Sequence, residues 1–142
     1  MDKEIKVSIP GREELSLKYQ ESGSQLHLIH LKAIGGPSLL GLVAEWRGKL
    51  KGPIASLPLP EGPSTGAMLL REVILRAQGK WQFPYEHEEL CHCRVVATAK
   101  VDAAVLTGAH HPRDVSKQTS ASTACGTCLP DVEAIIAYRL GK

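Results

Sequence analysis

The chain has 142 residues, of which 43% are hydrophobic and only 4% aromatic, so it can bury one ordinary core or two small ones built mainly from aliphatic side chains. The formal charge is +2 and the basic residues are scattered, which argues against the basic stripe of a nucleic-acid-binding protein. No stretch approaches about eighteen apolar residues, and the first residues form no apolar leader, so we expect a soluble cytoplasmic protein without a membrane partner.

Residues 4 to 34 predict an antiparallel three-stranded meander. Three runs alternate between apolar and polar residues, at 5–9, 15–19 and 26–31, with short breaks between them. On the third run the period of two predicts one face with Leu26, Leu28 and His30 and another with His27, Ile29 and Leu31. Because His27 and His30 then point to opposite faces, we expect ordinary strand histidines there and no metal pair.

Two helices are predicted to follow the meander. The first begins at Pro37, a residue suited to the first helical turn, and Gly48 is a plausible stop. Residues 52–63 contain four prolines and predict a stiff, extended connector. The second helix begins at about Ser64 or Thr65, runs to Gln78 and is closed by Gly79.

This order of elements resembles the NifU/IscU-type scaffold fold. Gly35-Gly36, followed by Trp46-Arg47-Gly48-Lys49-Leu50, is similar to the first-helix region of that family. The resemblance implies a scaffold-like α+β domain over residues 1–85. The sequence departs from the family in one respect, because residues 1–90 contain no cysteine. We therefore expect a degenerate scaffold-like domain without the family's cluster-building chemistry.

Half of the six aromatic residues lie close together at the predicted domain junction, at Trp81, Phe83 and Tyr85. We expect them to pack the two domains together. The alternative is a docking surface for a redox partner, since aromatic side chains concentrate at interface hot spots.

All four cysteines lie in the last third of the chain, as Cys91-His92-Cys93 and Cys125-Gly126-Thr127-Cys128. In a reducing cytosol such a set argues for a metal centre rather than disulfides or free thiols. Four thiolates can hold either a zinc ion or an iron–sulfur cluster. In an extended segment, Cys91 and Cys93 point the same way about 6.6 Å apart, which suits one iron of a [2Fe–2S] cluster better than zinc. His92 then points away, so we do not expect it to be a ligand.

The residues around the cysteines predict short helices. Thr98 can cap a helix that ends at Gly108, Pro112 can begin the next, and Pro130 can open the last. The second cysteine pair would then lie just before a helix N-terminus, where partial positive charge favours thiolates and sulfides. Side-chain hydroxyls that could donate hydrogen bonds to sulfur belong to Thr119, Ser122, Thr123 and Thr127.

Both cysteine motifs together resemble the bacterioferritin-associated-ferredoxin-like (BFD-like) [2Fe–2S]-binding domain, which is also found in the middle of NifU. The likeness rests on Cys91-His92-Cys93-Arg94-Val95-Val96 and on the segment Thr119 to Cys128, and it spans residues 86–142. In that family a C-x-C pair, a helical hairpin and a C-G-x-C pair bind one cluster. The resemblance therefore implies a small all-α domain at 86–142 with Cys91, Cys93, Cys125 and Cys128 as the ligands.

These observations predict an α+β chain that binds one [2Fe–2S] cluster and transfers electrons to a protein partner. Nothing in the sequence resembles a substrate pocket, a nucleotide loop or a Ser/His/Asp set, so we do not expect an enzyme. Two alternatives remain at this point: a NifU-like protein that assembles or delivers iron–sulfur clusters to a partner, and a zinc-stapled interaction module.

Overall fold

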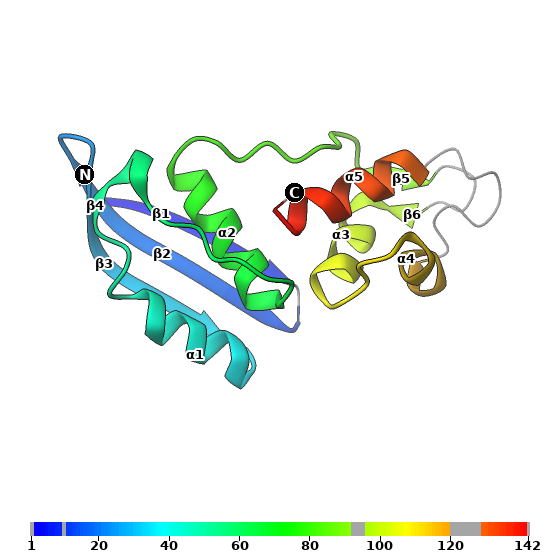
Figure 1. Ribbon diagram of the computed structural model, residues 1–142, viewed down its shortest axis with the longest axis horizontal. Helices are drawn as coiled ribbons and strands as arrows, with labels where there is room; N and C mark the ends of the chain where they lie inside the picture. Colours follow the sequence, from blue (N-terminus) through cyan, green and yellow to red (C-terminus); the bar gives the residue numbers. More distant parts are fainter. Residues whose placement is uncertain (1, 10, 92–95, 120–128, 142) are drawn as a thin grey trace. The chain divides into compact units, whose positions relative to one another are not determined.

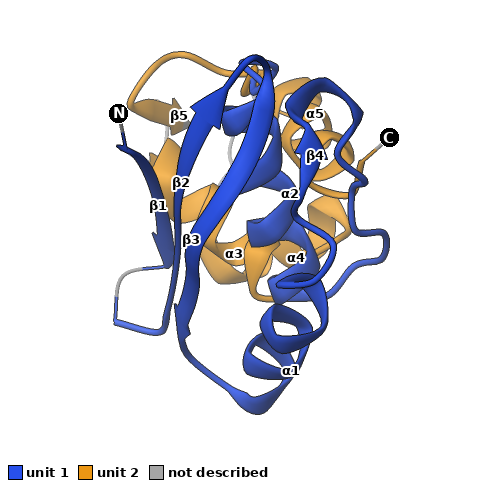
Figure 2. Ribbon diagram, turned by 90° about the vertical axis from the view of Figure 1, so that its left-hand side faces the viewer, with its two compact units in different colours: residues 1–81 blue, residues 82–142 orange. Residues whose placement is uncertain are grey.

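The computed structural model describes residues 2–9, 11–91, 96–119 and 129–141. The chain divides into two compact units, residues 1–81 and 82–142 (Figure 2). The predicted boundary, between residues 85 and 86, lies a few residues further along the chain. The fold class is the predicted α+β, with an antiparallel meander followed by helices.

Unit 1 is built on an antiparallel sheet in which neighbours in sequence are neighbours in space (Figure 1). The strands are β1 (Asp2–Ile9), β2 (Glu13–Ser22) and β3 (Gln25–Ile34), and they confirm the predicted meander. A short fourth strand, β4 (Gly52–Pro53), pairs with the beginning of β3 and was not predicted. Alternate residues of β2 are almost fully buried, including Leu15 and Leu17, so one face of the sheet forms the core.

A β-bulge in β3 overturns part of the predicted facing. Lys18 pairs with His30, whereas the next residue, Tyr19, pairs with Leu28, so β3 contains one residue more than β2 at this point. The extra residue reverses the alternation of faces beyond it. Leu31 is consequently buried in the core, as Leu26 is, and the prediction that these two leucines lie on opposite faces is wrong.

Two helices cover the core face of the sheet. The first, α1 (Pro37–Trp46), packs on β3, and the second, α2 (Thr65–Ala77), packs on β1 and β2. Both begin as predicted: Pro37 lies in the first turn of α1, and the hydroxyl of Ser64 accepts a hydrogen bond from the Ala67 N–H. Gly66 allows the helices to approach closely, because a Cβ there would lie 3.2 Å from Leu42 Cδ2.

Two arginines tie the irregular parts of unit 1 to its sheet and helices. Arg47, which follows α1, donates from Nε to the carbonyl of Leu31 at 3.0 Å, on the part of β3 that β4 does not cover. Arg71, which is only 5% exposed, donates to the carbonyls of Pro60 and Gly62. These bonds satisfy backbone oxygens of the proline-rich connector and hold it against α2. The connector also contains a 3₁₀ turn at Ile54–Ser56.

Unit 2 contains three short helices and a small two-stranded sheet. The helices are α3 (Thr98–Leu106), α4 (Pro112–Thr119) and α5 (Leu129–Arg139), and the strands are β5 (Glu89–Cys91) and β6 (Val96–Ala97). The two strands were not predicted for this domain. Helix α3 packs against α4, α5 and both strands.

The predicted cap of α3 is wrong. Ala97 occupies the N-cap position and Thr98 is the first helical residue. The Thr98 hydroxyl instead donates to the His87 carbonyl at 2.5 Å, and the Thr98 N–H donates to the Glu88 carbonyl at 2.6 Å. The side chain therefore ties α3 to the segment that leads into β5, because this segment runs beside the start of the helix.

Each of the three junction aromatics contacts a residue of its own unit. The Arg76 guanidinium lies over the Trp81 ring at 5.3 Å in unit 1. In unit 2 the Arg139 guanidinium lies over the Phe83 ring at 5.7 Å, and the Tyr85 hydroxyl donates to the Glu89 carbonyl. Both predicted roles of this aromatic group, packing between domains and partner docking, stay predictions.

Among the described residues, no helix is long and apolar enough to cross a membrane.

The buried leucines of β2 predict a large stability difference between two matched substitutions. Leu17→Ala removes a side chain with 0% exposure and should lower the free energy of unfolding of unit 1 by about 3 kcal/mol, through lost burial and a residual cavity. Leu59→Ala makes the same change at a side chain that is 41% exposed and should cost less than about 1 kcal/mol. Urea denaturation monitored by circular dichroism measures both, and equal losses would contradict the described core.

Candidate metal centre

The first predicted ligand lies at the end of a strand that is fixed on both sides. Cys91 is the last residue of β5, and its backbone pairs with Val96 of β6. The pairing register shifts between Glu89 and Cys91. The bonds from Thr98 to the carbonyls of His87 and Glu88 hold the segment before this strand against α3, and the Tyr85 hydroxyl donates to the Glu89 carbonyl within the same segment. The two strands on either side of residues 92–95 therefore both lie against α3.

The second cysteine pair immediately precedes α5. Cys128 is followed by Leu129, the first residue of the helix, and Asp131 lies in the first turn. The first turn of a helix has backbone N–H groups without partners inside the helix, and it carries partial positive charge. Pro130 has no N–H, so Leu129, Asp131 and Val132 supply the amides of this turn. An anionic sulfur at this end of α5 is electrostatically favoured.

The other predicted site residues lie outside the described residues. These are His92, Cys93, Ser122, Thr123, Cys125, Thr127 and Cys128, together with the side chain of Cys91. Thr119 is described: it is the buried last residue of α4, and its hydroxyl donates to the Val115 carbonyl at 2.8 Å. The Thr119 hydroxyl, predicted as a possible donor to sulfur, is therefore bonded within its own helix.

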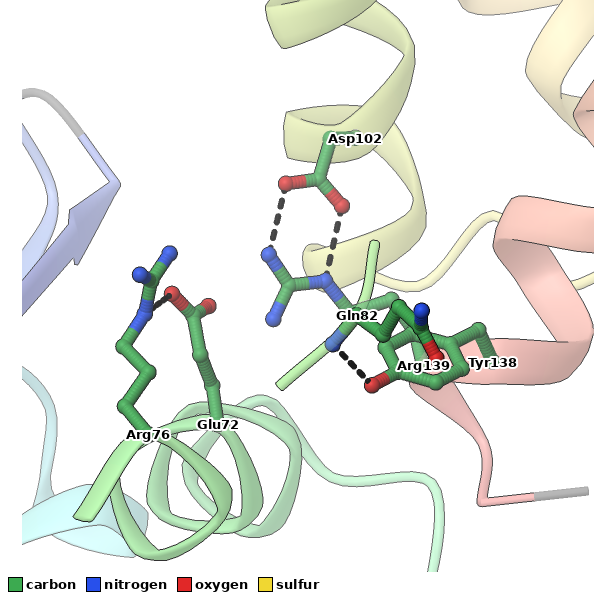
Figure 3. A network of polar contacts seen from close by, with 6 residues as sticks. All are labelled: Glu72, Arg76, Gln82, Asp102, Tyr138 and Arg139. Carbon is green, nitrogen blue, oxygen red and sulfur yellow. Dashed lines mark hydrogen bonds and ion pairs between the residues drawn. The ribbon is translucent and has the colours of Figure 1, made fainter. Parts of the chain in front are cut away.

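Helices α3 and α5 are clamped together by a charged pair that the sequence analysis missed (Figure 3). Arg139 of α5 donates from Nε and a terminal nitrogen to the two carboxylate oxygens of Asp102 on α3, at 2.7 and 2.6 Å. The side chain of Arg139 is 5% exposed and that of Asp102 19%. A bidentate arginine–carboxylate pair is stronger and more directional than a single neutral hydrogen bond.

The same end of α5 is tied to the beginning of unit 2. The Tyr138 hydroxyl accepts a hydrogen bond from the Gln82 N–H at 2.7 Å. Val132, Ile135 and Ile136 of α5 are buried as well, so one face of this helix belongs to the core of unit 2. Strand β5, which ends at Cys91, packs on α3, and α5 begins directly after Cys128. The contact between α3 and α5 therefore sets the positions of the chain before the first cysteine motif and after the second.

A sequence signal for the clamp exists. Arg139 follows Val132, Ile135 and Ile136 at helical spacing, so it lies on the inward stripe of α5, where an unpaired charge would be costly. Asp102 likewise lies between Val101 and Val105, which are both fully buried. A charge on each of two apolar stripes predicts an ion pair between the two helices.

The described histidines are placed as strand or helix-end residues. His27 and His30 lie in β3, where they pair with Gln20 and Lys18 of one face of β2, so the predicted placement on opposite faces is wrong. His110 Nε2 lies 3.1 Å from the Val105 carbonyl, and His111 Nδ1 accepts a hydrogen bond from the Arg113 N–H. Within the described ranges, no group of three or more His, Cys, Asp or Glu side chains could hold a metal ion.

One family model matches the part of the chain that carries the cysteine motifs. Residues 90–138 match the family model of the BFD-like [2Fe-2S] binding domain. The match spans both cysteine pairs, the β5–β6 sheet, α3, α4 and most of α5.

The C-terminal part of this chain is therefore a BFD-like [2Fe–2S] binding domain, and the cofactor of that domain is a [2Fe–2S] cluster. No curated protein and no solved structure matches the chain. The similarity of residues 1–85 to the NifU/IscU-type scaffold stays a prediction.

The clamp predicts how unit 2 responds to loss of one charge. Asp102→Ala should lower the free energy of unfolding of unit 2 by about 3 kcal/mol, because it leaves the buried Arg139 charge without this carboxylate. Asp114→Ala, at an exposed position in the first turn of α4, removes the same charge and should cost less than about 1 kcal/mol. Hydrogen exchange of the α3 and α5 amides distinguishes the two, and equal protection in both variants would contradict a role for the clamp.

Proposed function

We propose that the chain is an electron-transfer protein that holds one [2Fe–2S] cluster through Cys91, Cys93, Cys125 and Cys128. The family match over residues 90–138 carries the proposal, because it assigns a [2Fe–2S] cluster to the stretch that contains all four cysteines of the chain. When bound, the cluster supplies reversible one-electron chemistry.

The donor set fits this cofactor. Each iron of a [2Fe–2S] cluster takes two terminal ligands, and thiolate sulfur is the usual one. The chain offers two close cysteine pairs, so each pair supplies one iron. The first pair begins at the end of β5 and the second ends at the start of α5, and both of these elements pack on α3.

The charges of unit 2 also suit a negatively charged centre. Residues 91–142 contain six basic and four acidic side chains. Lys100, Arg113 and Lys117 are exposed on α3 and α4 and make no ion pair within the described part of the chain. Together with the amides at the start of α5, these charges would offset the negative charge of four thiolates and two sulfides.

The ligand count supports electron transfer over catalysis at the cluster. If the protein fills all four terminal positions, no coordination site is open to a substrate, whereas catalytic metal sites keep one. The role left to the chain's own residues is to hold the sulfurs rigidly and to limit reorganisation when the charge of the centre changes. A partner protein would then exchange electrons with the domain from outside.

Cluster assembly or delivery is the second role that the sequence leaves open. Residues 1–90 contain no cysteine, so they offer no second thiolate set on which a cluster could be built. We therefore place electron transfer first, and the two roles differ in what happens to the cluster on contact with a partner.

Single substitutions test the ligand set. Replacing any one of Cys91, Cys93, Cys125 or Cys128 by Ala should abolish most of the visible absorption of the purified protein and lower the protection of unit 2, while residues 1–80 stay folded. His92→Ala is the matched control within the same motif and should keep its absorption. Loss of the spectrum in His92→Ala, or its persistence in a cysteine variant, would contradict the assignment.

Reversibility separates the two roles. A spectroscopic redox titration should show one-electron reduction and reoxidation with full recovery of the spectrum over repeated cycles. Mixing the oxidised protein with a cysteine-containing apo-ferredoxin and separating the two should leave iron on this chain. Iron that moves to the apo-ferredoxin, with no stable redox cycle, would favour delivery over electron transfer.

A further inference from the structure

Unit 1 has a polar pocket on the face of its sheet that the helices leave uncovered. The pocket has a volume of about 420 Å³, within the usual range for sites that take small molecules. Its lining comes from β1, β2 and β3 and from Arg47, which follows α1. All of these residues belong to unit 1, so the pocket is independent of the cysteine motifs.

The centre of the pocket is a row of three side chains across the sheet. Lys6 of β1 pairs with Ser16 of β2, and Ser16 pairs with Lys32 of β3. Residues directly opposite each other in an antiparallel sheet project from the same face, so two ammonium groups flank one hydroxyl. Two like charges arranged in this way repel each other unless something negative lies between them.

The carboxylates that line the pocket form no ion pair with Lys32 or Arg47 among the described residues. Lys6 has a partner, Glu4, at 3.5 Å, but both side chains are more than 40% exposed, so the pair is weak. Lys32 makes no ion pair with any described residue, and neither does Glu14. The side chain of Arg47 makes one hydrogen bond within the described part of the chain, from Nε to the Leu31 carbonyl, which leaves its terminal nitrogens available.

The His30 ring also has a polar atom without a hydrogen-bond partner among the described residues. Its Nδ1 is buried and has no hydrogen-bond partner among the described residues. A buried polar atom without a partner is unfavourable and needs an explanation. His30 lines the same pocket as Lys32 and Arg47, and all three come from β3 or from the segment that covers its edge.

We propose that this pocket binds a small organic anion, with its phosphate or carboxylate group between Lys32 and Arg47. The two cations supply charge-assisted hydrogen bonds, which are roughly twice as strong as neutral ones. Lys6, Ser16 and His30 add to the polar lining, which also includes the carboxylates of Glu4 and Glu14. The two carboxylates would repel an extended polyanion, so the pocket suits a single small anion better than a nucleic acid.

Nuclear magnetic resonance of the ¹⁵N-labelled full chain tests the proposal. Titration with inorganic phosphate and, separately, with citrate should shift the amides of Lys6, Ser16, His30, Lys32 and Arg47 in a saturable way in the millimolar range. The two probes distinguish a phosphate preference from a carboxylate preference, and saturation by either supports the anion site.

Three charge variants sharpen the test. Lys32→Gln should weaken binding by roughly tenfold, since it removes one charge-assisted contact. Lys51→Gln is the matched control: Lys51 is exposed and does not line the pocket, so affinity should stay within about twofold of the parent. Glu14→Gln removes a nearby negative charge and should tighten binding by up to about fivefold.

The result that would overturn the proposal is equally direct. Shifts that do not saturate with either probe, or an equal loss of affinity in Lys32→Gln and Lys51→Gln, would mean non-specific attraction. All three substituted side chains project from the surface of unit 1, so the variants should fold, and the circular dichroism of each checks this.

Discussion

The proposed cluster site depends on one constraint: sulfur atoms from two short motifs, separated by thirty-one residues, would have to reach a single diiron centre. Helices α3 and α4 lie between the motifs, and holding them in place before the cluster binds lowers the conformational entropy that binding costs. Unit 2 meets this requirement by packing α3 against α4, α5 and the β5–β6 sheet. The Arg139–Asp102 pair adds a directional bond between α5 and α3, the two helices next to the cysteine motifs.

In unit 1, helices cover only one face of the sheet, and the other face is polar. The helices bury the face of Leu15, Leu17 and Leu31, while the other face carries the row Lys6–Ser16–Lys32. Without cysteines this unit has no thiolate chemistry of its own. A small-anion site on its open face would give it a role that does not depend on the cluster.

The regular parts of the fold were predictable because local signals determine them. Pro37 and Ser64 begin their helices as expected, since each supplies what a helix start requires, a fixed φ or a capping oxygen. The bulge in β3, opposite Lys18 and Tyr19 of β2, was not predictable. The register of β3 depends on its pairing with β2 and not only on the alternation of its own residues. The prediction that Thr98 caps α3 failed for a similar reason. Its hydroxyl donates a hydrogen bond to the His87 carbonyl, eleven residues earlier in the chain, instead of capping the helix. The cysteine spacing and motifs predicted the cluster, whereas the clamp and the pocket need residues brought together by tertiary structure.

Iron and acid-labile sulfide analysis of the full chain, purified without oxygen, determines whether the protein holds a [2Fe–2S] cluster. We expect two irons and two sulfides per chain, which is the composition of the cluster that the matched domain binds. One zinc per chain with no sulfide, or cysteines joined in disulfides with no metal, would contradict it.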